Sequence, residues 1–363
     1  MITKLENDQY VYFTRENSEE TTLEDLFFAH PDSIDMLNTF PTILVMDSIY
    51  KTNTYRMPLF EIVGVTSTKI TYFVVFVFLS FERENNFIWT LEMLVGFLTS
   101  KRNMPKVIVT DRDPTLMKAV AEVLPKTDHV LCYFHIEKNV NAKPSKAKVV
   151  DKDAKEADDD KHCELVKKIM RAWRDVVNSP KEDSFAIAWL TFKDEVCGPF
   201  PLFVKYVEET VFPLKKHFVR AWTNKYLHLG CRTTNIVESD HAQLKRYLRS
   251  SLGDLTSCWD EIDKMLKTQF DEIQESFGRS IAVMVHKYRK KNYSRSWRGM
   301  SLRPFWVSSM KNLNALRDSA LLKKIAVVCK WQRSGSLVLA FLPRRERKNF
   351  LFFWMKYTLI GEC

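Results

Sequence analysis

Short runs of β-branched and aromatic residues mark the strands of the first third of the chain. The apolar run at residues 42–46 predicts a buried strand, and the runs at residues 58–67 and 70–79 predict two more. Only Thr68 and Lys69 separate the last two runs, so we expect a β-hairpin. A single long apolar helix is the alternative, which the abundance of Val, Ile, Phe and Tyr disfavours.

The following segments alternate between helix and strand patterns. Apolar residues at three- and four-residue spacing predict helices over residues 84–98 and 115–124, and Pro114 suits the start of the second. Buried runs predict strands over residues 106–110 and 128–132. We expect the first three strands to be antiparallel and the last two to be joined by parallel crossovers, which gives a mixed α/β sheet.

The rest of the chain divides by composition. Residues 1–37 are polar and mixed, and we expect a short helix over residues 21–29. Residues 142–161 are rich in Lys, Ala and Asp, with almost no apolar residues, and predict an exposed linker. Further helices are expected within residues 162–229, and over the stretches 234–248 and 257–277.

Composition narrows the class of protein. A hydrophobic fraction of 45% supports a sizeable core, and seven cysteines without a CxxC pair indicate reduced thiols. The N-terminal MITKLENDQY lacks the apolar stretch of a signal peptide, so we expect no secretory leader. The longest apolar run, residues 70–81, is too short to span a bilayer.

Positive charge is concentrated in the C-terminal quarter. Residues 279–363 contain 19 Lys and Arg against 3 Asp and Glu, a net charge of +16, whereas the whole chain carries +10. The clusters HKYRKK (286–291) and PRRERK (343–348) are typical of localisation or polyanion-binding patches. A solvated tail, or a tail folded onto the body through its apolar residues, is the alternative.

Two aspartates stand where strand-like runs end. Asp47 and Asp111, 64 residues apart, each follow a β-branched run. Side chains at such strand ends converge at one edge of an open sheet, where ligands usually bind. The alternative is that both are turn or cap residues, a common role for Asp after a strand.

Four motifs in order carry a family resemblance. They are MDSIYKTNTYRMPLFEIVGV, PKVIVTDRDPTLMKAV, LCYFHIEKNV and TTNIVESDHAQLK, and together they cover roughly residues 40–266. This set resembles the transposase domain of Mutator-like elements (MULE), which is also found in plant transcription regulators of the far-red-impaired-response type. The resemblance implies a ribonuclease-H-like DDE core with an all-α insertion before the third acid.

Carried over residue by residue, the family's catalytic triad falls on Asp47, Asp111 and Glu238. The 127 residues between the last two acids are many for a bare ribonuclease-H-like fold, and the helical segment 162–229 accounts for them as the insertion. Ile49 replaces a Thr that is usual in the family. The expected domains are residues 1–37 as an N-terminal extension, 38–141 as the first part of the core, 142–230 as linker and helical insertion, 231–278 as the completed core, and 279–363 as a basic tail.

The triad implies a metal-dependent reaction on DNA. Three carboxylates suit two Mg²⁺ ions, or Mn²⁺ in their place, which activate an oxygen nucleophile and stabilise the leaving oxygen. Without metal, such a cluster repels itself and raises its own pKa values. Cys132 and His135 are expected as a structural pair near the site rather than half of a zinc site, because no clear second pair of ligands is present.

Contacts to DNA follow from the same resemblance. Trp222 could stack on an unpaired base, although core packing is the commoner role of Trp. The other candidates for contact with phosphate are Arg232, His241, Lys245, Arg246 and Arg249, for which a solvated helix face is the alternative. The implied partners are DNA and a second copy of the chain, in the nucleus, with no membrane and no small-molecule substrate.

The sequence therefore predicts a transposase-type domain for Mg²⁺-dependent DNA cleavage and strand transfer. The zinc-binding modules that often flank such domains leave no CxC or Cys-x-His pattern here, which favours a transposon-derived or truncated copy. The alternative is a non-enzymatic nuclear regulator that binds DNA and is domesticated from such a transposase.

Overall fold

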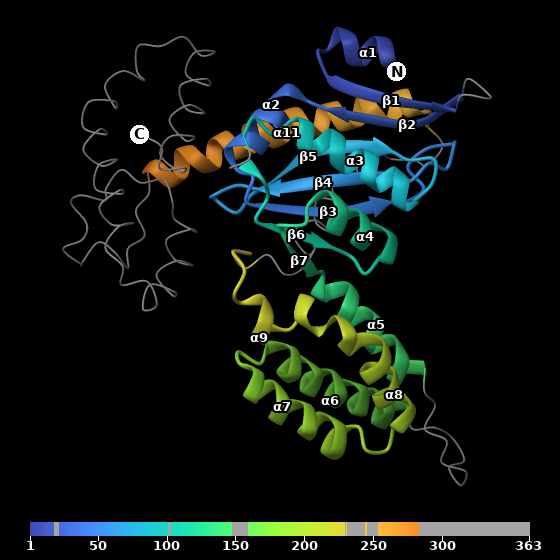
Figure 1. Ribbon diagram of the computed structural model, residues 1–363, viewed down its shortest axis with the longest axis vertical. Coiled ribbons are helices and arrows are strands. Elements are labelled where there is room, and N and C mark those ends of the chain that lie inside the picture. The colour runs from blue at the N-terminus through green and yellow to red at the C-terminus, as the bar shows by residue number, and fades with distance from the viewer. Residues whose placement is uncertain are drawn as a thin grey trace, which may run out of the picture.

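A seven-stranded sheet forms the centre of the upper part of the molecule (Figure 1). The computed structural model describes residues 1–17, 22–100, 103–146, 159–228 and 253–282, together with Gly230 and Leu244. The sheet has the order β1-β2-β5-β4-β3-β6-β7. Its strands are β1 (Val11–Asn17), β2 (Thr22–Ala29), β3 (Ile43–Ile49), β4 (Leu59–Val65), β5 (Thr71–Phe78), β6 (Val107–Thr110) and β7 (Asp128–Leu131).

The strand directions match those expected from the sequence. All pairs among β1 to β5 are antiparallel, whereas β3, β6 and β7 run parallel. The hairpin of β4 and β5 is confirmed, as are both later strands. Parallel strands need crossover helices, which α3 (Glu84–Gly96) and α4 (Pro114–Val123) supply. The mixed α/β class is therefore confirmed.

Helices cover both faces of the sheet. The ring of Phe87 on α3 lies 5.1 Å from that of Phe60 on β4. The next strand residue, Glu61, acts electrostatically on Cys258 of the long helix α11 (Leu255–Ala282). Successive strand residues point to opposite faces, so α3 and α11 cover opposite sides, and Figure 1 shows α11 passing behind the sheet. The helix expected over residues 257–277 is confirmed within α11.

The N-terminal segment differs from the expectation. A helix over residues 21–29 was expected, and this is wrong, because the segment forms β2 between β1 and β5. Its residues 26–29 are all buried, with Phe27 and Phe28 fully so. Pairing on both edges and burial of the aromatic pair override the local pattern. The sheet thus begins well before residue 38.

A buried carboxylate fixes β2 to its neighbours. Asp25 is fully buried and accepts hydrogen bonds from the backbone N–H of Ser80 at 2.9 Å and from Asn86 Nδ2 at 2.9 Å. Arg15 Nε lies 3.3 Å from the same carboxylate. Since a buried charge is costly unless it is paired, these donors hold the end of β5 and the start of α3 in place.

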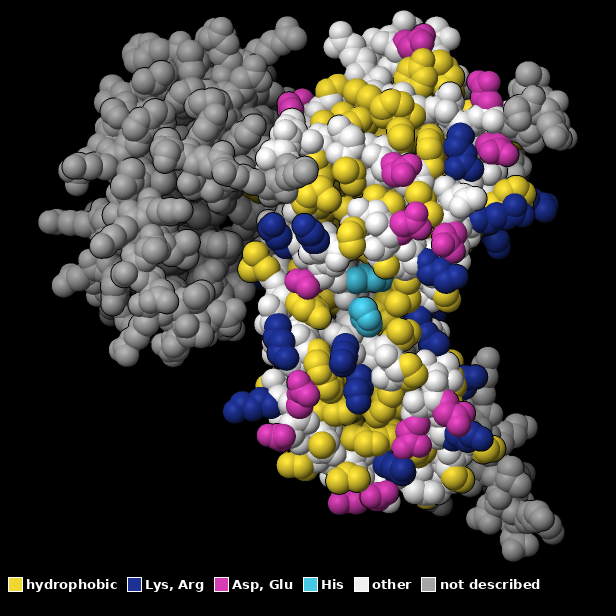
Figure 2. Space-filling model, in the orientation of Figure 1, with side chains coloured by type: hydrophobic (Ala, Val, Ile, Leu, Met, Phe, Trp, Pro, Cys, Tyr) yellow, Lys and Arg dark blue, Asp and Glu magenta, His cyan; other side chains and the backbone are white. Residues whose placement is uncertain are grey.

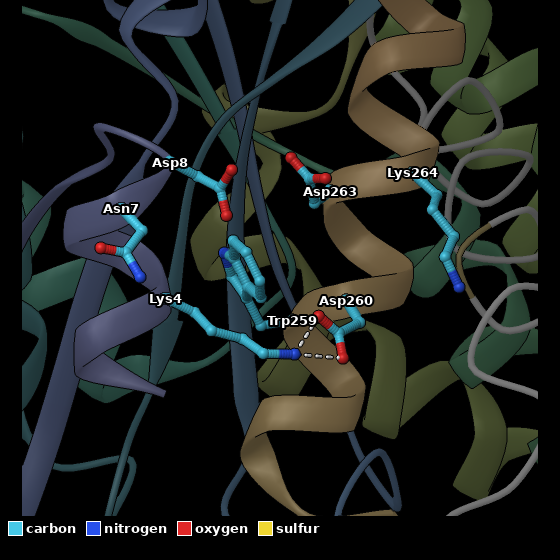
Figure 3. A pocket seen from close by; sticks show the side chains of 7 residues that line it. All are labelled: Lys4, Asn7, Asp8, Trp259, Asp260, Asp263 and Lys264. Atoms are coloured by element: carbon cyan, nitrogen blue, oxygen red, sulfur yellow. Dashed lines mark hydrogen bonds and ion pairs between the residues drawn. The ribbon is translucent and has the colours of Figure 1, made fainter.

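The N-terminal helix α1 (Ile2–Asn7) packs against α11. Between them lies an open hollow of about 350 Å³, lined by Lys4, Asn7, Asp8, Trp259, Asp260, Asp263 and Lys264 (Figure 3). Lys4 Nζ lies 2.7 Å from both oxygens of Asp260, and Tyr10 donates to Asp263 at 2.9 Å. Neither Asp47 nor Asp111 lines this hollow. These polar contacts join the N-terminal segment to α11, about 250 positions later in the chain.

The lower part of the molecule is helical (Figure 1). We call residues 159–223 the helical module. It consists of α6 (Asp159–Asn178), α7 (Glu182–Leu190), α8 (Pro201–Tyr206) and α9 (Arg220–Thr223), two π-helical segments, η2 (Thr191–Val196) and η3 (Val207–Val211), and the 3-10 helix η4 (Phe212–His217). Several helices were expected here, and this is confirmed.

The module has a hydrophobic core of its own. Trp173 of α6 is fully buried at its centre, with ring centroids of Phe192 and Phe218 at 5.9 and 6.3 Å. The core continues into Ile136 and Val140 of α5 (Tyr133–Lys146), the helix that leads from the sheet into the module. Shared packing along α5 therefore joins the two parts.

The linker expected over residues 142–161 is wrong at both ends, where α5 continues to Lys146 and α6 begins at Asp159. Ala and Lys are good helix formers, so the lack of apolar residues does not stop either helix. The helix expected over residues 234–248 lies outside the described residues except for Leu244, which is helical and buried. Residues 283–363 of the basic tail also lie outside them. In the described part of the chain, no helix is both long and apolar enough to cross a membrane.

A candidate active site at the ends of β3 and β6

The sheet register places Asp47 and Asp111 side by side. Met46 pairs with Thr110 as the last match between parallel strands β3 and β6, so the next residue on each strand is an aspartate. On its other side Asp47 pairs with Glu61 of β4. The Ser48 N–H donates to Asp47 Oδ1 at 2.8 Å, which orients that carboxylate. Convergence of the two aspartates agrees with the sequence prediction.

The two carboxylates repel each other. The pKa of Asp111 is raised from 3.8 to about 6, first by burial and then by the negative charge of Asp47. Its neighbour Asp113 has a different role, because it caps α4 by accepting the N–H groups of Thr115 at 2.6 Å and Leu116 at 2.9 Å. Of the two acids in this turn, Asp111 is therefore the one whose ionised form is destabilised by its surroundings.

A cationic histidine stands next to this acidic pair. The pKa of His135 in the first turn of α5 is raised to about 9, first by its interaction with the Cys132 thiol and then by Asp47 and Asp111, against the effect of burial. Cys132 itself is buried at the end of β7. His135 therefore carries positive charge at neutral pH and offsets part of the negative charge of the aspartates.

Two nearby groups were not identified from the sequence. Tyr50, just beyond β3, is largely exposed and donates to Glu82 Oε2 at 2.8 Å, and its pKa is raised by partial burial, by Glu82 and then by Asp111 and Asp47. Glu61, the partner of Asp47 on β4, is fully buried. A lone Glu inside the apolar run LFEIVGV is a sequence signal that could have drawn attention to this position.

A hydrogen-bonded chain ties the acidic edge to the helical module. Thr110 Oγ1 donates to the Asp111 carbonyl at 2.7 Å, so it accepts from His129 Nε2 at 2.8 Å. His217 of η4 donates from Nδ1 to the His129 carbonyl at 2.8 Å. The pKa of His129 is lowered to about 4, by burial and by His217, which keeps the His129 ring neutral. No sequence pattern links these residues, since His129 and His217 are 88 positions apart.

The proposed third acid and the expected phosphate contacts lie outside the described residues: Glu238, Arg232, His241, Lys245, Arg246 and Arg249. Trp222 is described and partly buried, with its ring 5.1 Å from that of Phe185 in the module core. Packing accounts for the position of Trp222. Among the residues that the structure describes, no three His, Cys, Asp or Glu side chains form a group suited to hold a metal ion.

Comparison with known proteins identifies the segment that carries this site. The MULE transposase domain matches residues 43–139, which run from β3 into α5 and include both aspartates, Cys132 and His135. This segment is similar to the MULE transposase domain, so the resemblance inferred from the sequence motifs is confirmed for residues 43–139.

Curated relatives match different shares of the chain. FAR1-RELATED SEQUENCE 11 and FAR-RED IMPAIRED RESPONSE 1, both of Arabidopsis thaliana, are 31% and 29% identical over 31% and 37% of this chain, and the match covers 16% of each. The PKS-NRPS hybrid synthetase cheA of Chaetomium globosum is 26% identical over 77% of this chain but over 6% of its own length. The chain thus spans at most 16% of the length of these three relatives.

Proposed function

We propose that this chain has a ribonuclease-H-like DDE core and performs metal-dependent cleavage and strand transfer of DNA. The observation that carries the proposal is the register of β3 and β6, which makes Asp47 and Asp111 neighbours inside the matched MULE segment. Glu238 is proposed as the third acid. The helical module, which precedes Glu238 in the chain, is then the all-α insertion.

The residues present fit a divalent cation. Carboxylate oxygens are the ligands that Mg²⁺ and Mn²⁺ prefer. The pKa of Asp111 is raised by burial and by the charge of Asp47, and a cation held by these acids would relieve the second effect. Bound there, two such ions would supply Lewis-acid stabilisation of the attacking and leaving oxygens. Asp47 and Asp111 would hold them together with Glu238. We propose no zinc site at Cys132 and His135.

The remaining groups would prepare the site for a phosphodiester. His135, cationic at neutral pH, offers positive charge next to the acids and would attract a phosphate oxygen. The hydrogen bond from Tyr50 to Glu82 holds an exposed phenol ring at the rim, where it can orient a nucleotide. A DNA partner, a homo-oligomeric state and a nuclear location belong to the same proposal.

A non-enzymatic function is the second candidate. It is favoured by the relatives named FAR-RED IMPAIRED RESPONSE 1 and FAR1-RELATED SEQUENCE, which match this chain at 24–31% identity. On this alternative, the domain binds DNA in the nucleus as a regulator, and the acidic pair is retained without turnover. The two candidates differ in one measurable property, which is metal-dependent breakage of a DNA strand.

A nicking assay on the full chain distinguishes them. With Mg²⁺ or Mn²⁺ we expect nicked DNA, and the Asp111→Asn variant should lose at least about 100-fold in rate, since even second-shell changes at metal sites cost 10–100-fold. Asp113→Asn is the matched control, because Asn also caps a helix and activity should persist. DNA binding without nicking under any metal condition would favour the regulator.

A further inference from the structure

Charge is segregated along the helical module and the residues that directly follow it. Residues 159–209 contain eight Lys and Arg against ten Asp and Glu. Residues 210–230 contain four Lys and Arg and no acid at all. We call residues 215–225, which include these four cations, the basic segment. A solvated helix surface normally mixes both signs, so a segment free of acids indicates a polyanionic partner.

Two cations of the basic segment are free to bind a partner. Lys216 and Arg220 are both exposed, and neither has a carboxylate within ion-pair distance in the part of the chain that the structure describes. Lys225 is also exposed, 3.7 Å from Glu182, a weak pair that a stronger anion can displace. By contrast, two other exposed cations of the module are paired more closely: Lys193 lies 2.9 Å from Glu208, and Arg174 lies 2.6 Å from Glu137.

The fourth cation stiffens the segment. Lys215 Nζ lies 5.4 Å from the ring centroid of Phe185 and 5.5 Å from that of Trp222. Such cation–π contacts hold the chain of η4 against the module core and limit its motion. Lys216 and Arg220, which flank the next turn, are therefore presented from a fixed backbone rather than from a loose loop.

The basic segment lies next to the acidic edge of the sheet. His217 within it is bonded to the His129 carbonyl, and His129 is bonded to Thr110, the residue before Asp111. Figure 2 shows Lys and Arg side chains around a group of His side chains where the upper and lower parts of the molecule meet. Cations are thus fixed beside the place where a phosphodiester would meet the aspartates.

We propose that the basic segment binds the phosphate backbone of duplex DNA through Lys216 and Arg220, with Lys225 joining after release from Glu182. This inference rests on the proposed function for the identity of the polyanion. The carboxylates of Asp47 and Asp111 repel phosphate, so binding energy for the DNA must come from cations outside the acidic pair. The basic segment supplies such cations on the module side of the site.

The test compares two double variants of the full chain. Lys216→Ala with Arg220→Ala removes the unpaired cations. Arg174→Ala with Lys193→Ala removes two cations of the same module that are closely paired, with Glu137 at 2.6 Å and Glu208 at 2.9 Å. Fluorescence anisotropy with a duplex of about 25 base pairs measures affinity against salt. Each phosphate contact contributes about 0.9 to the slope of log affinity against log salt. We expect the first variant to lower the slope by about 1.8, and the control to leave it unchanged.

Further measurements separate this inference from the proposed function. Lys216→Arg with Arg220→Lys keeps both charges and should restore the slope, which excludes misfolding as the cause of a loss. An unchanged slope in the first variant, or an equal loss of slope in the control, would overturn the proposed role of the basic segment in DNA binding, even if the protein nicks DNA. A loss limited to the first variant would support it even if no nicking is found.

Discussion

Replacing Asp111 by Asn should make the metal-free protein more stable at neutral pH. Burial and the charge of Asp47 raise the pKa of Asp111 from 3.8 to about 6. An acid whose pKa is higher in the folded than in the unfolded state destabilises the fold above its unfolded pKa. This penalty grows as the pH rises from 3.8 to about 6 and stays constant above that. At about 1.36 kcal/mol per pKa unit, the shift is worth roughly 3 kcal/mol.

Urea unfolding followed by circular dichroism, with a chelator present, measures this effect. The variant should gain about 2–3 kcal/mol at neutral pH and almost none below about pH 4, where both states of the wild type are protonated. Added Mg²⁺ should narrow the gap, because a cation offsets the repulsion in the wild type alone. Asp113→Asn, which keeps an α4 cap, should change stability by only a few tenths of a kcal/mol, or about 0.5 at most.

The reasoning fails if Asp111→Asn destabilises the protein at neutral pH, or if its gain does not depend on pH. Either result would mean that Asp111 is stabilised as a carboxylate by donors in the fold, as a structural turn residue would be. The alternative interpretation of Asp111 as a cap or turn residue would then replace the metal-site interpretation.

Three further substitutions, and Gly96→Ala as a control for the first, test the packing. Gly64→Ala would place a Cβ 2.2 Å from the Tyr72 ring and should cost about 1–3 kcal/mol of unfolding free energy, whereas Gly96→Ala, with open space around it, should cost nothing. Trp173→Ala should cost about 3–5 kcal/mol in chemical denaturation, because the side chain is fully buried in the module core. Asp25→Ala should lower the melting temperature, with a loss of about 3 kcal/mol or more of unfolding free energy. The reason is that the buried donors of Ser80 and Asn86, and the Arg15 side chain, lose this carboxylate.

The sequence predicted the elements whose signal is local. Strands β3 to β6 are runs rich in β-branched and aromatic residues. Asp47 lies near the end of β3 and Asp111 directly follows β6, so their convergence could be inferred from strand order alone. The local pattern of residues 21–29 predicts a helix, whereas the burial that makes this segment the strand β2 depends on β5, some 50 residues later in the chain. A pattern within nine residues does not contain that information.

The residues around the site could not be predicted from the sequence either, because their contacts join segments that are distant in the chain. The contact of His217 with His129 joins the module to the sheet across 88 positions, and nothing near either residue marks it. Tyr50 stands in a recognised motif, but its bond to Glu82 depends on the return of the chain after β5. The sequence indicates which residues are candidates for the site, whereas their hydrogen-bond partners depend on tertiary packing.

The position of the acidic pair depends on strand register more than on the aspartates themselves. Side chains alternate across a sheet, so a slip of one residue between β3 and β6 would send Asp47 to the opposite face from Asp111. Both faces are covered, by α3 and α11, and β4 and β5 are buried along their whole length. A slip would therefore turn the side chains of the shifted strand to the opposite faces, where they would not fit the side chains of α3 and α11. Burial thus raises the pKa of Asp111 and also fixes the register that brings it next to Asp47. The packing of the sheet therefore offsets the unfavourable electrostatic free energy of the acidic pair.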